Sequence, residues 1–130
     1  MRQEEHNIQV ACVRWFNLQY PQYRGLLFSV PNGGARNLVT AAKLKAEGVV
    51  AGVADILLLV PKQRQILYAC VGYPLIEESI NGLCIEMKTK KGSQSREQKE
   101  WQKKVEAAGY RYVIVRSVEQ FIKEINDYLK

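Results

Sequence analysis

The spacing of hydrophobic residues divides the chain into alternating helical and extended segments. Residues 4–19 predict a helix, because Ile8, Cys12, Trp15 and Leu18 recur at helical spacing and form an apolar stripe. Helical patterns also cover residues 37–47 and 95–108, and a last helix follows Ser117. Its apolar stripe consists of Val118, Phe121, Ile122, Ile125 and Leu129. The chain therefore has four predicted helices.

Extended segments lie between these helices. Residues 25–30 and 110–115 read as short strands, and the continuous apolar run that begins at Ile56 predicts a strand buried on both faces. From Leu83 onward the pattern alternates, so Leu83, Ile85 and Met87 face one way and Cys84, Glu86 and Lys88 the other. This segment is the predicted central strand.

Residues 61–82 have the least regular pattern. Lys62 to Gln65 resemble a turn, Ile66 to Val71 allow a short strand, and Gly72, Pro74 and Gly82 act as breakers. We expect this part to be a solvent-facing excursion, and its sequence indicates no role.

The order of these segments predicts an α/β fold, with a mixed central sheet flanked by helices on both sides. A chain of 130 residues, 47% hydrophobic and 25% charged, suits one globular domain covering residues 1–130. No apolar run follows the N-terminal residues, and the most apolar stretch, residues 49–60, is too short to cross a bilayer. We therefore expect a cytoplasmic protein without a membrane partner.

Cysteine and histidine usage excludes several kinds of site. The three cysteines, Cys12, Cys70 and Cys84, are far apart and form no Cys-x-x-Cys pair, so a zinc ribbon or redox motif is not expected. We interpret them as reduced, mostly buried thiols. His6 is the only histidine, which argues against a zinc site built on several histidines.

Asp55, Glu86 and Lys88 are the candidate catalytic residues. They would meet if the strands beginning near residues 55 and 83 pair in antiparallel fashion. Two carboxylates about 4 Å apart repel by roughly 4 kcal/mol at an effective dielectric of 20, and a divalent cation reverses that sign. Oxygen ligands favour Mg²⁺ or Mn²⁺ over zinc, and an adjacent lysine can serve a water in phosphodiester hydrolysis. The alternatives are a turn-closing Asp55 and an ordinary Glu86–Lys88 salt bridge on an exposed sheet face.

Two further residues have both a structural and a functional interpretation. Glu5 lies on the apolar stripe of the first helix, either as an exposed first-turn acid or as a group directed at a site. Gln98 follows Ser95 at the spacing of a capping box, and it also lies on the apolar face of its helix. Both alternatives remain open for each residue.

Basic residues gather after the central strand, and the formal net charge is +6 with a pI near 9.3. This balance suits either a polyanionic partner or a merely soluble basic domain. The cluster beside the proposed site favours phosphate binding. The candidate DNA-binding residues are Lys90, Lys91, Arg96, Lys99 and Lys103.

These motifs together resemble the stand-alone VRR-NUC domains, a branch of the PD-(D/E)xK nuclease superfamily. The resemblance spans nearly the whole chain, although the family pattern favours proline where Ala54 stands. The most specific motif is Gly92-x-x-Ser95-x-x-Gln98-x-x-Trp101, which follows Ile85-Glu86-Met87-Lys88. The other matching motifs are Glu5-x-x-Ile8-Gln9, Pro31-Asn32-Gly33-Gly34, Gly48, Gly52-Val53-Ala54-Asp55 and Gly109.

The resemblance implies a restriction-endonuclease-like fold and metal ligands at Asp55, Glu86 and the Met87 carbonyl oxygen. It implies that Lys88 is the catalytic lysine, that Glu5 reaches the metal directly or through water, and that Gln98 orients the lysine or the water. We accordingly expect a Mg²⁺- or Mn²⁺-dependent endonuclease for branched DNA such as Holliday junctions, acting in DNA repair as a homodimer.

Three other functions remain as alternatives. One is a catalytically silent nucleic-acid-binding module with the same fold. The others are a nuclease that acts on flap or linear DNA and a nuclease that acts on RNA.

Overall fold

The computed structural model describes residues 2–31, 38–67, 72 and 74–130. Its helices are α1 (Arg2–Gln19), α2 (Leu38–Ala46), α3 (Arg96–Ala107) and α4 (Val118–Leu129), with a 3₁₀ turn η1 (Pro21–Tyr23) after α1. Its strands are β1 (Leu27–Ser29), β2 (Ile56–Leu58), β3 (Lys62–Leu67), β4 (Pro74–Ile80), β5 (Leu83–Met87) and β6 (Arg111–Val115).

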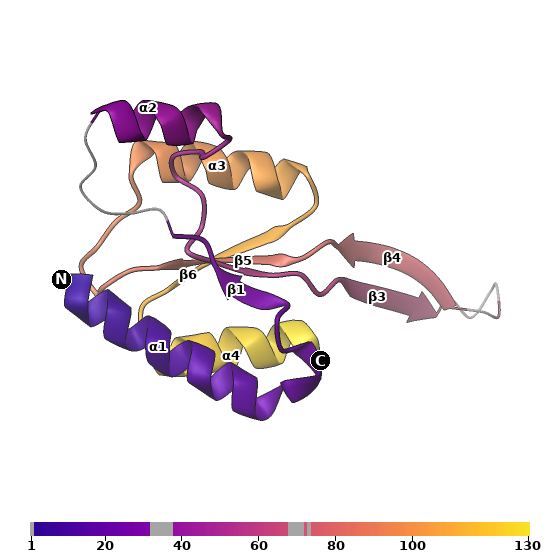
Figure 1. Cartoon of the computed structure of the whole chain (residues 1–130). Coiled ribbons are helices and arrows are strands. Elements are labelled where there is room, and N and C mark those ends of the chain that lie inside the picture. Colours follow the sequence, from indigo (N-terminus) through magenta and orange to yellow (C-terminus); the bar gives the residue numbers. More distant parts are fainter. Residues whose placement is uncertain (1, 32–37, 68–71, 73) are drawn as a thin grey trace.

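Four of the strands form a mixed sheet in the order β1-β2-β5-β6. The first two pairings are antiparallel, and β5 pairs with β6 in parallel. Helices α2 and α3 lie on one side of this sheet, and α1 and α4 lie on the other (Figure 1). The predicted mixed sheet with helices on both sides is confirmed.

Strand β5 is the buried centre of the sheet, and all five of its residues are buried. Leu83, Ile85 and Met87 pack in the larger core beneath the sheet, while Cys84 belongs to a smaller core with Ala54 and Tyr112. The predicted alternation along this strand is therefore confirmed. It delivers the side chain of Glu86 to the opposite face from Ile85.

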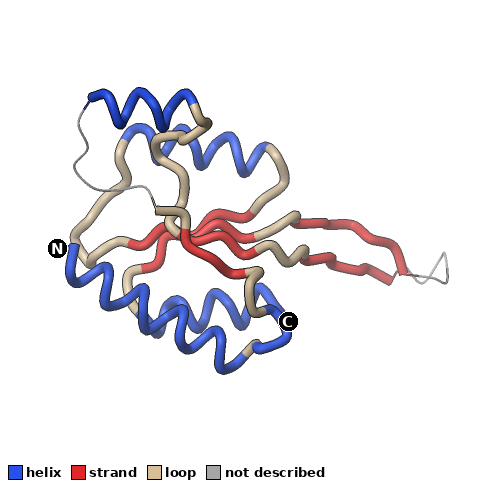
Figure 2. Tube along the Cα trace, in the orientation of Figure 1, coloured by secondary structure: helices blue, strands red, loops and turns tan. Residues whose placement is uncertain are grey.

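The excursion between β2 and β5 is a hairpin. Strands β3 and β4 pair with each other in a separate two-stranded sheet that projects from the body of the protein (Figure 2). The prediction of a turn at Lys62 to Gln65 was wrong, because these residues begin β3. A ribbon held by its own backbone hydrogen bonds needs no alternating apolar pattern, so the polar sequence concealed the strand. Part of the strand predicted over residues 66–71 lies outside the described residues.

Helix α1 packs three residues of its predicted stripe, Ile8, Cys12 and Trp15, in or against the core, but it buries Phe16 in place of Leu18. Cys12 and Phe16 are fully buried, whereas Leu18 is 73% exposed. Positions four residues apart lie on one helix face, and Phe16 is one turn after Cys12 on that face. Trp15 is partly buried against the same core.

Helix α2 contacts the core less than its sequence predicted. None of its residues is buried, and Leu38 and Val39 are 88% and 79% exposed. Its end is as predicted: Gly48 has φ +105°, and the Val49 amide donates to the Leu44 carbonyl in a Schellman-type cap. The predicted cap at Asn37 and the turn at residues 32–34 lie outside the described residues.

Two of the three thiols are buried and free, namely Cys12 and Cys84. Burial raises the pKa of the Cys12 thiol to about 12 and that of Cys84 to about 11. These two are the reduced, buried thiols that the sequence predicted, and Cys70 lies outside the described residues. No helix in the described part of the chain is long and apolar enough to span a bilayer.

Candidate active site

Strand pairing brings Asp55 and Glu86 together. Ile56 is the partner of Ile85 in the antiparallel pair β2–β5, so continuing this register by one residue places Asp55 opposite Glu86. The Met87 amide donates a 2.7 Å hydrogen bond to Oδ2 of Asp55. Asp55 therefore receives its amide donor from the neighbouring strand, and the alternative of an aspartate that closes its own turn is wrong.

Glu86 is a buried carboxylate with an unsatisfied oxygen. Its side chain is 1% exposed, and its Oε1 atom has no hydrogen-bond partner. Burial above all, together with hydrogen bonding to Asp55 and repulsion from Asp55 and Glu5, raises the pKa of Glu86 to about 9, and the charge of Lys88 partly opposes this rise. Such an oxygen is costly unless another group satisfies it.

A divalent cation fits this pair of carboxylates. The partnerless Oε1 of Glu86 and the Asp55 carboxyl are hard oxygen donors, the kind that Mg²⁺ and Mn²⁺ prefer. Among the described residues, no three His, Cys, Asp or Glu side chains lie close enough together to hold a metal by themselves. A cation here would therefore take its remaining ligands from backbone carbonyls and water, as Mg²⁺ commonly does.

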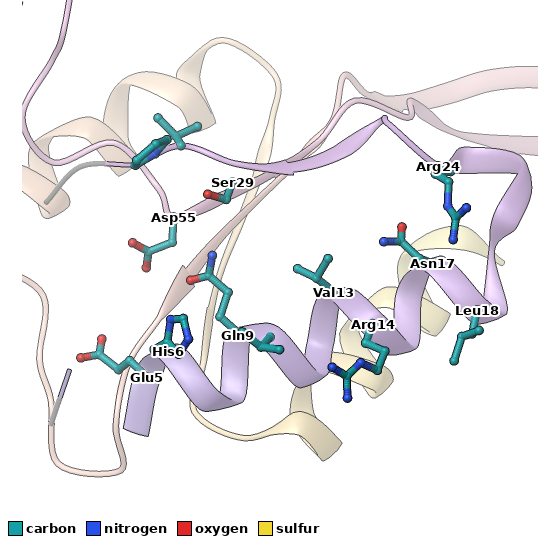
Figure 3. Close-up of a pocket in the computed structure, with 13 residues that line it drawn as sticks. Glu5, His6, Gln9, Val13, Arg14, Asn17, Leu18, Arg24, Ser29 and Asp55 are labelled. Atoms are coloured by element: carbon teal, nitrogen blue, oxygen red, sulfur yellow. The ribbon is translucent and has the colours of Figure 1, made fainter. Parts of the chain in front are cut away.

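Glu5 faces the same region from the first turns of α1. It lines a groove of about 1000 Å³ with Asp55, and the two carboxylates approach it from opposite walls (Figure 3). Glu5 also interacts electrostatically with Glu86. Because Glu5 does not complete a three-carboxylate cluster, a water between it and the cation fits this arrangement better than direct coordination.

Lys88 follows β5 on the same face as Glu86 and is half-buried. Its ammonium forms no ion pair with the described carboxylates, although its charge lowers the pKa of Glu86. The alternative of an exposed Glu86–Lys88 salt bridge is therefore wrong. The lysine remains available to a group that enters the site.

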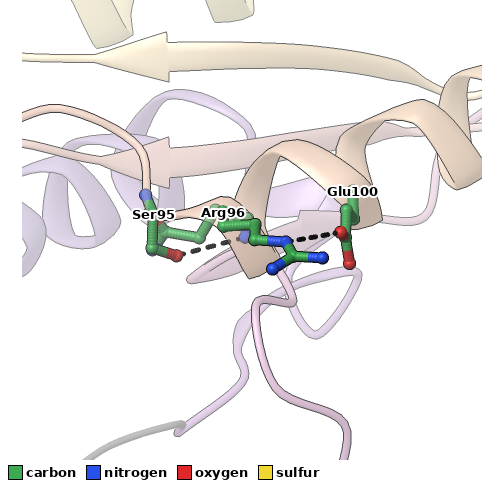
Figure 4. A network of polar contacts seen from close by, with 4 residues as sticks. Ser95, Arg96 and Glu100 are labelled. Atoms are coloured by element: carbon green, nitrogen blue, oxygen red, sulfur yellow. Dashed lines mark hydrogen bonds and ion pairs between the residues drawn. The ribbon is translucent and has the colours of Figure 1, made fainter.

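Gln98 closes the capping box predicted for α3. The backbone N–H of Gln98 donates a 3.2 Å hydrogen bond to Oγ of Ser95. The backbone N–H of Ser95 donates a 2.8 Å hydrogen bond to the side-chain Oε1 of Gln98. Figure 4 shows Ser95 at the start of α3, and the exposed ion pair of Arg96 and Glu100 spans the first turn of that helix. The side-chain oxygen of Gln98 is already bonded in the cap. Its side-chain amide nitrogen is therefore the atom that is left to orient Lys88 or a water.

The candidate DNA-binding residues are all exposed. Lys90 and Lys91 lie in the loop after β5, and Arg96, Lys99 and Lys103 share one face of α3. The loop and the first turn of α3 follow the strand that carries Glu86. These charges therefore lie on the segment that leads away from the two carboxylates.

Two more residues organise this region. Arg116 was not predicted from the sequence, and Gly52 was noted there only as part of a motif. Arg116 donates from Nη1 to the Thr89 carbonyl at 2.7 Å and to the Gly92 carbonyl at 2.6 Å, so it ties down the loop after Lys88. Gly52 has φ +85°, and a Cβ atom there would lie 2.5 Å from the backbone of Glu97. The glycine motif before Asp55 was a visible signal, whereas nothing local to Arg116 indicated its contacts.

Comparison with known proteins identifies the family and the fold of this chain. The VRR-NUC domain family matches residues 2–119. A solved structure of a "VRR_NUC domain protein" superposes with a TM-score of 0.72 at 22% identity, over 96% of this chain and 87% of that one, which shows the shared fold. No curated protein has a significantly matching sequence.

The family match covers most of the chain, and the similar solved structure has the same fold. A VRR-NUC domain is a nuclease-type module, for which DNA is the expected substrate. The chain belongs to the VRR-NUC domain family.

Proposed function

We propose that this protein is a metal-dependent endonuclease that hydrolyses phosphodiester bonds in branched DNA. The observation that supports it most is the buried, partnerless Oε1 of Glu86 beside the Asp55 carboxyl. A purely structural carboxylate is normally satisfied where it is buried. A site that binds a cation explains why this one is not.

The proposed site uses residues from α1, the start of β2, β5 and α3. Asp55 and Glu86 bind Mg²⁺ or Mn²⁺ with the Met87 carbonyl oxygen, and Glu5 acts through water. When bound, the cation supplies charge stabilisation at the phosphoryl oxygens and lowers the pKa of a water. Lys88 holds the attacking water or the developing phosphate charge, and the amide nitrogen of Gln98 orients the lysine or the water.

Hydrolysis transfers the elements of one water across a single P–O bond. The water oxygen forms the new bond to phosphorus, the bridging oxygen leaves and takes up a proton, and no redox change occurs. A Holliday junction is the proposed substrate, and a homodimer presents two such sites to two strands. The exposed lysines after β5 bind the DNA backbone without reading base sequence.

The test is cleavage of a four-way junction and its matched linear duplex, in Mg²⁺ and in Mn²⁺, by the wild type and Asp55→Asn. We expect the wild type to cut the junction and the variant to lose at least about a hundredfold in rate, since it lacks a metal ligand. Glu97→Gln, an exposed acid on the first turn of α3, is the matched control and should retain activity.

Other outcomes separate the alternatives. Equal cutting of both substrates would keep the nuclease and refute the junction preference. Binding without cutting would favour the catalytically silent module. Melting with and without Mn²⁺ adds a readout independent of substrate, because a cation that binds the folded state raises its melting temperature, and Asp55→Asn should lose this increase.

A further inference from the structure

The groove that contains Asp55 extends well beyond the proposed metal site. It runs along α1 and is walled on the other side by β1 and the segment after it. Glu5, His6 and Asp55 lie at one end, and Asn17, Leu18 and Arg24 lie at the other (Figure 3). None of the candidate DNA-binding residues named from the sequence lines it.

The charges along this groove are divided by position. The carboxylates of Glu5 and Asp55 occupy the end at the proposed metal site, and the guanidinium groups of Arg14 and Arg24 lie farther along. Both arginines are exposed, and neither has an ion-pair partner within the described ranges. A polyanion held at the cation by one of its charges would meet these guanidinium groups with charges several positions farther along its chain.

The dimensions suit several nucleotides of one strand. Glu5 and Arg14 are separated along α1 by about 14 Å at a rise of about 1.5 Å per residue. That distance is about four steps of a stacked strand at roughly 3.4 Å per step. Exposed Val10 and Leu18 in the same groove offer apolar surface to sugars.

We propose that the α1–β1 groove binds the phosphodiester backbone of one DNA strand that leads away from the scissile phosphate. Arg14 and Arg24 contact its phosphates, and Gln9, Asn17 and Ser29 supply neutral hydrogen-bonding groups. This inference rests on the proposed function for the position of the scissile phosphate. It adds a strand-binding track on the α1 side of the sheet, separate from the lysines of α3.

The test is the salt dependence of binding to a fluorescent twelve-nucleotide oligo(dT), measured by anisotropy in EDTA so that no cleavage intervenes. Each lost phosphate contact on a single strand lowers the slope of log K against log salt by about 0.7. Arg14→Gln/Arg24→Gln should therefore lower it by about 1.4. Binding would be about 25-fold weaker at 0.1 M salt, converging with the wild type near 1 M.

Two control variants make the result specific. Lys43→Gln/Lys45→Gln removes the same two charges from α2, outside the groove, and should leave the slope unchanged. Arg14→Lys/Arg24→Lys keeps the charges and should retain most of the slope. If the double glutamine variant is unstable by thermal melting, each single variant should still lower the slope by about 0.7.

An unchanged slope in the glutamine variant, or an equal drop in the α2 control, overturns the inference. The inference is also overturned if the slope is unchanged while light scattering shows that the glutamine variant has a different molecular mass from the wild type. That result would indicate that a second copy of the chain occupies the groove. If the glutamine variant shows the slope change but the wild type cuts no DNA, the proposed nuclease function is refuted and the α1–β1 groove remains a strand-binding site. If the wild type cuts DNA normally but the variant has an unchanged slope, the nuclease function stands and the groove is refuted as a strand-binding site.

Discussion

At the scale of single residues, the candidate site depends on side chains whose surroundings contradict their usual preference. Glu86 is a carboxylate in a buried strand, and Gly52 is a glycine pressed against a helix. A buried carboxylate is unfavourable by itself, and a glycine is needed where the backbone packs this closely. Glu86 lies beside the Asp55 carboxyl, and Gly52 packs against the first turn of α3.

Gly52→Ala should destabilise the protein by at least about 2 kcal/mol. The new methyl group would lie 2.5 Å from the Glu97 carbonyl carbon and 2.8 Å from the Gln98 amide nitrogen, and the residue would also keep a φ of +85°. A Cβ clash with backbone cannot be relieved by rotating a side chain, so α3 and the segment that contains residue 52 would have to move apart. Urea denaturation measures the loss.

Gly48→Ala is the matched control, because Gly48 has φ +105° and open space around its Cβ position. It should cost only the backbone strain of about 1 kcal/mol. Equal losses in the two variants would show that close packing on α3 does not constrain residue 52.

At the scale of elements, the loop between β5 and α3 is held by the strand beside it. Arg116 follows β6, and its guanidinium group is bonded to the carbonyls of Thr89 and Gly92. Lys88, Lys90 and Lys91 belong to the same connection. The position of these positive charges therefore depends on β6 as well as on the loop itself.

Arg116→Met should lower the free energy of unfolding by about 2 kcal/mol, the usual range for hydrogen bonds from a charged donor. It should also increase proteolytic cleavage between Thr89 and Gly92, which limited trypsin digestion with mass spectrometry detects at Lys90 and Lys91. Arg96→Met is the control, since its pair with Glu100 is exposed and worth less than about 1 kcal/mol. An intact loop in Arg116→Met would contradict this role.

At the scale of the whole molecule, the two most exposed large hydrophobic residues of the described chain lie at the start of α2. Leu38 and Val39 are 88% and 79% exposed, although both are large hydrophobic residues at the start of a helix. A contiguous apolar surface on a folded chain commonly marks a protein contact. It is the natural candidate for the interface of the proposed homodimer.

Leu38→Glu/Val39→Glu should therefore convert a dimer into a monomer, because buried unpaired carboxylates oppose association. Light scattering at micromolar concentration measures the mass of both proteins. Gln19→Glu/Gln22→Glu adds the same charge at exposed positions near the end of α1 and should leave the dimer intact. A monomeric wild type would refute the dimer, and a dimeric variant would exclude α2 from its interface.

The sequence by itself determined the features that depend on neighbouring residues. The two-residue alternation of β5 assigns Glu86 and Cys84 to one face and Ile85 to the other, because side chains along a strand must alternate. The Ser95–Gln98 capping box and the Gly48 helix end were also predictable, since both are formed within a few residues.

Only the tertiary structure decided which distant groups meet. The β2–β5 register places Asp55 opposite Glu86, burial leaves Oε1 of Glu86 without a partner, and Arg116 reaches back to the loop after Lys88. The exposed face of α2 and the α1–β1 groove with Arg14 depend in the same way on how elements pack. Local periodicity indicates which face of a helix or strand is apolar. Which other element packs on that face is decided by contacts between residues far apart in the sequence. The same contacts decide which charged groups are left without a partner.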